Sequence, residues 1–85
     1  DDPLLYSNRS YSRLKTGDMK GAMQDINKSI KMYPGNSYAY RNRALIYIAM
    51  EKFEEACEDI QRALNNGFTE MYGDEVLTLQ SKYCK

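Results

Sequence analysis

A repeat of 34 residues is the feature that most constrains the fold of this chain. When residues 1–34 are compared with residues 35–68, six residues of the first unit fall on identical residues of the second. The identical pairs are Tyr6 and Tyr40, Asn8 and Asn42, Arg9 and Arg43, Ala22 and Ala56, Asp25 and Asp59, and Ile26 and Ile60. Similarity at a fixed period of this length indicates a stack of repeated structural units.

Each unit has the pattern of two amphipathic helices joined by a short turn. In the second unit, apolar residues recur at spacings of three and four, first over 40–47 and then over 53–64. Ala44 and Ala56 lie in the middle of the two apolar faces. A methyl side chain there lets two helix axes approach closely, so we expect a helical hairpin that packs against itself.

Turn and cap residues predict where the helices begin and end. We expect a first helix from Pro3 to about Lys15 and a second from Met19 to about Met32. Gly17 suits the left-handed conformation between them, and Asp18 suits the N-cap of the second helix. The equivalent turn of the second unit, at 51–52, has neither residue type and is a weaker terminator.

The repeat pattern resembles the tetratricopeptide repeat. The matching positions are Tyr6, Ser10, Ala22, Ile26 and Pro34 in the first unit, and Tyr40, Ala44, Tyr47, Ala56 and Ile60 in the second. The chain departs from the family at Arg9 and Arg43, which replace a leucine, at Arg13, which replaces an aromatic residue, and at Phe68, which replaces the second closing proline.

The resemblance implies an all-α fold, a right-handed α-solenoid of two antiparallel helix-turn-helix repeats plus a capping helix. The repeats would occupy residues 3–34 and 37–68, and the capping helix 69–85, in a single domain. Thr69 and Asp74 are alternative starts for the cap, because Gly73 interrupts the run. The ending Lys82–Tyr83–Cys84 is similar to that of small bacterial tetratricopeptide proteins, so we expect a small bacterial-type protein.

Composition argues against several classes of function. Twelve basic and twelve acidic residues give no net charge and form no basic stripe, so we expect no nucleic-acid partner. No apolar run approaches the length of a membrane span. The chain has no histidine, no Gly-rich phosphate loop and no inward pair of carboxylates, so we expect neither an enzyme nor a cofactor or metal site.

The resemblance implies that the first helices of both units line a concave groove, which would bind a peptide or protein segment. Asparagine can pair with both N–H and C=O of an extended peptide, and tyrosine supplies rigid contact area. The expected groove residues are Leu4, Ser7, Asn8, Tyr11, Lys15, Tyr38, Arg41, Asn42, Leu45 and Ile48. In the alternative interpretation, Tyr11, Leu45 and Ile48 only pack against neighbouring helices.

Asn8 also matches an asparagine with which chaperone adaptors of this family clamp a C-terminal carboxylate. The positions of the two cations of that clamp hold Tyr38 and Asn42, so the clamp is incomplete. A different class of function is structural: the outer face of the first helix carries Leu5 and Tyr6 and has no neighbour in a two-repeat stack. This face predicts a homodimer through exposed repeat ends, or a place within a longer solenoid.

Three pairs of residues are candidates for structural bonds. We expect Arg9 and Arg43 to form ion pairs with Asp25 and Asp59, as part of each hairpin rather than as catalytic groups. Cys57 and Cys84 lie where the fourth helix and the cap run antiparallel, so a disulfide is one reading and a buried free thiol at Cys57 the other. A disulfide would indicate an exported protein, and a free thiol leaves the cytoplasm as the default.

Overall fold

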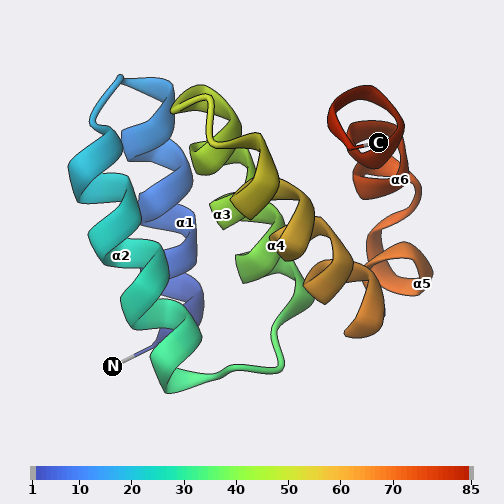
Figure 1. Cartoon of the computed structure of the whole chain (residues 1–85). Helices are drawn as coiled ribbons and strands as arrows, with labels where there is room; N and C mark the ends of the chain where they lie inside the picture. Colours follow the sequence, from blue (N-terminus) through green and yellow to red (C-terminus); the bar gives the residue numbers. More distant parts are fainter. Residues whose placement is uncertain (1, 85) are drawn as a thin grey trace.

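The computed structural model describes residues 2–84, which form an all-helical fold without strands (Figure 1). Its helices are α1 (Pro3–Lys15), α2 (Met19–Met32), α3 (Ser37–Ala49), α4 (Phe53–Asn65), α5 (Phe68–Tyr72) and α6 (Glu75–Tyr83). Helices α1 and α2 form one antiparallel hairpin, α3 and α4 form a second beside it, and α5 and α6 lie at the far end (Figure 1). The expected α-solenoid is confirmed, and so are the predicted bounds of α1 and α2.

Local residues account for the helix starts. Asp2, Asp18 and Asn36 each accept a hydrogen bond from a backbone N–H in the first turn of α1, α2 or α3. Helix α4 begins after Lys52, which makes no such bond. The residue before it, Glu51, has a left-handed φ of 59°, a conformation that costs a residue with a Cβ more than it costs glycine.

The core consists of two apolar clusters. One joins the hairpins: Ala22 and Ile26 of α2 pack with Ala39 and Ile46 of α3, and all four are fully buried. The other joins the second hairpin to the cap, and its buried members are Tyr40, Ala44, Ile60, Ala63, Phe68 and Val76. Alanine at these contacts allows the close helix approach that the sequence predicts.

The cap consists of two helices rather than one. Gly73 separates α5 from α6 with a left-handed φ of 91°, which ends the first helix after Tyr72. Of the two expected starts of the capping helix, Asp74 is the one that precedes α6, and α5 is a short additional helix that was not expected. Phe68 begins α5 and is buried against the second hairpin, so the residue in place of the closing proline serves as a core residue of the cap.

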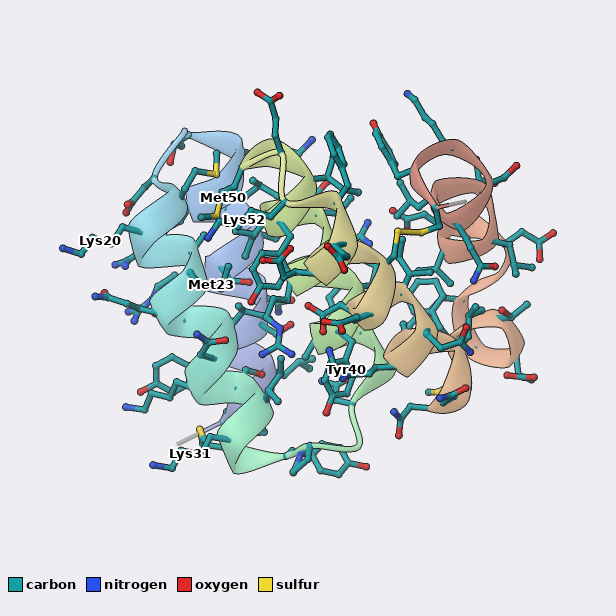
Figure 2. All side chains as sticks on the ribbon, viewed as in Figure 1. Lys20, Met23, Lys31, Tyr40, Met50 and Lys52 are labelled. Atoms are coloured by element: carbon teal, nitrogen blue, oxygen red, sulfur yellow. A yellow bond between two sulfur atoms is a disulfide. The ribbon has the colours of Figure 1, made fainter. Side chains whose placement is uncertain are left out.

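A disulfide joins the cap to α4. The Cα atoms of Cys57 and Cys84 lie 5.7 Å apart, and their sulfur atoms are bonded. Figure 2 shows this bond as a yellow link between α4 and α6. The bond agrees with the expected antiparallel placement of α4 and the cap. Helix α6 begins directly after Asp74, and this start brings Cys84 beside Cys57. Localisation outside the cytoplasm stays a prediction.

Each hairpin contains the expected ion pair. Arg9 donates to both carboxylate oxygens of Asp25, each at 2.8 Å, and Arg43 donates to those of Asp59 at 2.8 and 2.9 Å. Arg13 also approaches Asp25, at 3.4 Å, which explains an arginine where the family has an aromatic residue. Hydrogen bonding from Arg9 lowers the pKa of Asp25 below its usual value, although burial of the carboxylate opposes this shift.

Candidate partner-binding groove

A hollow of about 360 Å³ opens between α1, α3 and α6. Its lining residues are Tyr11, Leu14 and Lys15 of α1, Arg41, Leu45, Ile48 and Ala49 of α3, and Glu75 of α6. Five of the residues expected in the groove therefore lie together here, although they come from both hairpins. We call this surface the α1–α3–α6 hollow.

Arg41 makes several contacts at the edge of the hollow. Its guanidinium donates to both carboxylate oxygens of Glu75 and, at 2.7 Å, to the side-chain oxygen of Asn42. It also lies over two tyrosine rings, 5.0 Å from the centroid of Tyr11 and 5.2 Å from that of Tyr38. Only 12% of the Arg41 side chain is exposed. The pair of Arg41 with Glu75 joins α3 to the cap. Because Glu75 balances its charge, Arg41 is not a free cation for a ligand.

The exposed part of the hollow combines apolar side chains with the Lys15 ammonium and the partly exposed carboxylate of Glu75. Leu45 and Ile48 of α3 lie one helical turn apart and are half-buried. The Lys15 ammonium lies 5.2 Å from the centroid of the Tyr11 ring, at the end of α1. A ligand in the hollow would therefore meet aliphatic side chains, one aromatic ring, one exposed ammonium and the Glu75 carboxylate, whose charge is balanced by Arg41.

Two of the expected groove residues are instead buried between the hairpins. Ser7 and Asn42 have no exposed surface, and the Asn42 amide donates to the Ser7 carbonyl at 3.1 Å and to its hydroxyl at 3.0 Å. Asn42 is one residue after Arg41 and so lies about 100° round the helix, facing α1 rather than the hollow. Neither residue is available to a ligand, so their assignment to the groove was wrong.

The remaining expected residues lie outside the hollow. Tyr38 packs on the Tyr72 ring of α5, with centroids 5.5 Å apart. Leu4 is about half exposed in the first turn of α1, and Asn8 is exposed on the same helix. Sequence reasoning missed Glu75, because it belongs to the cap, which was not expected to line the groove.

Within residues 2–84, no helix combines the length and hydropathy needed to cross a membrane. Among the same residues, no group of three or more acidic or cysteine side chains is arranged to hold a metal ion.

Comparison with known proteins identifies the repeats. Two family models described as tetratricopeptide repeat match residues 4–36 and 26–58, which together span most of both hairpins. Repeats of this family commonly mediate protein–protein interaction and are generally non-enzymatic. No solved structure matches the chain significantly.

Several curated proteins share the repeats. Human sperm-associated antigen 1 is 33% identical over 64 residues, which are 75% of this chain and 7% of that protein. Human tetratricopeptide repeat protein 34 is 39% identical over 66 residues, covering 78% of this chain and 11% of that protein. The rice SGT1 homolog is 30% identical over 80 residues, covering 94% of this chain and 21% of that protein.

The chain thus spans only a small part of these animal and plant relatives, and the expected bacterial type stays a prediction. The repeat signature is shared across both hairpins and by proteins that carry the family's name. The chain belongs to the tetratricopeptide repeat family.

Proposed function

We propose that this chain binds an extended segment of a partner protein in the α1–α3–α6 hollow. The observation that carries the proposal is the gathering of Tyr11, Leu45 and Ile48 from two hairpins around one opening of about 360 Å³. This volume is within the range that a ligand-binding cleft needs. The family's common role in protein–protein interaction supports the same conclusion.

The lining of the hollow predicts the chemistry of the bound segment. An aliphatic or aromatic side chain would remove the exposed parts of Leu45 and Ile48 from water, which contributes about 25 cal/mol per Å² of apolar surface buried. A carboxylate next to that side chain would lie near the Lys15 ammonium. We therefore expect short segments in which an apolar residue is followed or preceded by an acidic one.

The experiment is a selection of random peptides on the folded protein, repeated with charge-reversed variants. Lys15→Glu is expected to shift the selected peptides from acidic to basic residues, because the group facing the peptide changes sign. Lys20→Glu is the matched control, since Lys20 projects away from the protein on α2 (Figure 2). The proposed site would be contradicted if the two variants selected the same peptides as each other. A shift from acidic to basic peptides caused only by Lys20→Glu would contradict it as well.

A second pair of variants tests the apolar part of the hollow. Leu45→Ser is expected to weaken a selected peptide at least about 10-fold, since a leucine contact of this kind contributes more than 1.4 kcal/mol. Met23→Ser makes a comparable change on α2, outside the hollow, and should leave the affinity unchanged. Circular dichroism of both variants checks that each is still folded. Equal losses for the two variants would contradict the proposal.

A further inference from the structure

Three of the five methionines line one hollow between α2 and the end of α3. This hollow has a volume of about 480 Å³ and shares no lining residue with the α1–α3–α6 hollow. Met19 and Met23 belong to α2, and Met50 directly follows α3. Figure 2 shows Met23 on α2 and Met50 at the turn of the second hairpin, both beside this hollow. We call these three residues the methionine cluster.

The 34-residue repeat relates the methionine cluster to the disulfide. Met23 is equivalent to Cys57, and Met50 is equivalent to Cys84. Met50 and Cys84 each directly follow a helix that packs against the preceding hairpin, so the equivalence holds in the structure as well. In the second unit, the Cα atoms of these two positions lie 5.7 Å apart and the sulfur atoms are bonded. Because the two equivalent methionines line one hollow, we expect their sulfur atoms to approach one another in the same way.

Met19 adds a third sulfur atom on the same side of α2. It lies four residues before Met23, so the two side chains are neighbours on one helix face, with Cβ atoms about 5–6 Å apart. The equivalent residue Phe53 stacks on Tyr83, the residue before Cys84, so this position also reaches the following helix in the second unit. Methionine has three rotatable bonds, which let neighbouring sulfur atoms turn toward a common centre.

The side chains around this hollow favour a soft ion over a hard one. Besides the methionines, its lining residues are Lys20, Gln24 and Asn27, and the Lys20 side chain points away from the protein (Figure 2). Two amide oxygens are too few for a hard cation such as Ca²⁺, which takes about six to eight oxygen ligands. Thioether sulfur is instead a soft ligand that selects Cu⁺.

We propose that the methionine cluster binds a soft monovalent cation of the class of Cu⁺ through its three thioether sulfur atoms. The absence of histidine led us to expect no metal site, but thioether ligands do not require histidine. Thiolates would compete for such an ion, and the two cysteines of the chain are bonded to each other. The proposal is independent of the α1–α3–α6 hollow.

The test is a titration of the disulfide-bonded chain with Ag⁺, a soft monovalent ion, in a buffer free of chloride and thiols. The methyl NMR signals of the methionine Cε groups report binding at each residue. Ag⁺ should shift the signals of Met19, Met23 and Met50. Met32 and Met71 are exposed outside the hollow and should not shift at the same concentration. Mg²⁺ in place of Ag⁺ should shift no methionine signal, because it prefers oxygen ligands.

A leucine variant distinguishes coordination from packing. Met23→Leu keeps an apolar side chain of similar volume and removes the sulfur atom, so the chain should remain folded by circular dichroism. It should raise the Kd for Ag⁺ at least about 10-fold, since even the loss of a group that only orients a metal ligand costs that much. Met71→Leu is the matched control and should leave the Kd unchanged. Titration of both variants with Cu⁺ against a colour-forming chelator should give the same pattern.

A cysteine variant tests the geometry without a metal ion. Because the equivalent residues form a disulfide, Met23→Cys with Met50→Cys should form a second one when dissolved O₂ takes up the two thiol hydrogens. Mass spectrometry after thiol alkylation measures whether the new cysteines are bonded. Met23→Cys with Met71→Cys is the control and should retain both free thiols.

Three results would overturn the proposal. Ag⁺ could shift all five methionine signals at the same concentration, which would indicate binding to any accessible thioether. Met23→Leu could leave the Kd for Ag⁺ unchanged. The variant with Met23→Cys and Met50→Cys could also retain both thiols, which would place the two side chains too far apart to share an ion.

Discussion

The two hairpins share their ion pair but place it in different surroundings. Asp59 is fully buried and its partner Arg43 is 18% exposed, whereas Asp25 is 6% exposed at the side chain and Arg9 is 53% exposed. The second hairpin lies between the first hairpin and the cap, while the first is covered on one side only. The same residues therefore contribute differently to stability, because a bond buried in protein is not weakened by water.

The largest expected effect is on the buried ion pair. Asp59→Ala leaves Arg43 without its carboxylate inside the protein, which should cost about 3–5 kcal/mol of the free energy of unfolding. Asp25→Ala should cost less than half as much, because water can solvate Arg9. Urea denaturation followed by circular dichroism measures both losses. Equal losses would show that burial does not distinguish the two hairpins.

The disulfide should matter next, and mainly at the cap. Cys57→Ser with Cys84→Ser opens a loop of 27 residues and should cost about 3.5 kcal/mol by loss of the chain-entropy constraint. Amide exchange should become faster in α6 than in α1 and α2, because only the cap loses its covalent link to α4. Reduction of the wild-type chain is the control and should reproduce the pattern. An equal acceleration of amide exchange in all helices would contradict this prediction.

A smaller effect is expected from exchanging the turns within the hairpins. Gly17 and Glu51 are equivalent residues and both adopt a left-handed φ, but only Glu51 carries a Cβ there. Glu51→Gly with Lys52→Asp copies the first turn and its cap into the second, which should stabilise the chain by about 1 kcal/mol. Tm measures the gain.

The reverse change tests the same explanation in the first turn. Gly17→Ala should lower stability by about 1 kcal/mol through backbone strain alone, because an added Cβ at Gly17 meets no neighbouring atom within 4 Å. A rise in Tm for Gly17→Ala would show that the left-handed conformation carries no such cost.

The smallest expected effect is a dependence of the free energy of unfolding on pH in the acidic range. The pKa of Asp25 is lower in the folded chain than in the unfolded chain, chiefly because Arg9 donates to it. Its contribution is therefore complete above the unfolded pKa of about 4 and is lost as the pH falls through the folded pKa. Asp25→Asn should flatten the decline of stability below about pH 4. Urea titrations at several acidic pH values measure this, and an unchanged decline would rule out Asp25 as a contributor.

The sequence by itself determined the repeat, the first two helices and the pairing of Arg9 with Asp25. These features depend on local caps, on helical spacing and on a relation that holds within each hairpin. The left-handed turn at Gly17 follows from the same local rules. The family resemblance implied that residues of both first helices line one groove, and ligand binding there stays a prediction.

Only the tertiary structure decided which of those residues face a ligand. Asn8 and Asn42 are identical in the repeat, yet one is exposed and the other fully buried, because only α3 has a hairpin in front of it. The pairing of Glu75 with Arg41 joins the cap to α3, and no periodic pattern indicates that contact. Exposure and contacts between distant segments depend on how the hairpins stack, whereas the residues of one helix specify only that helix.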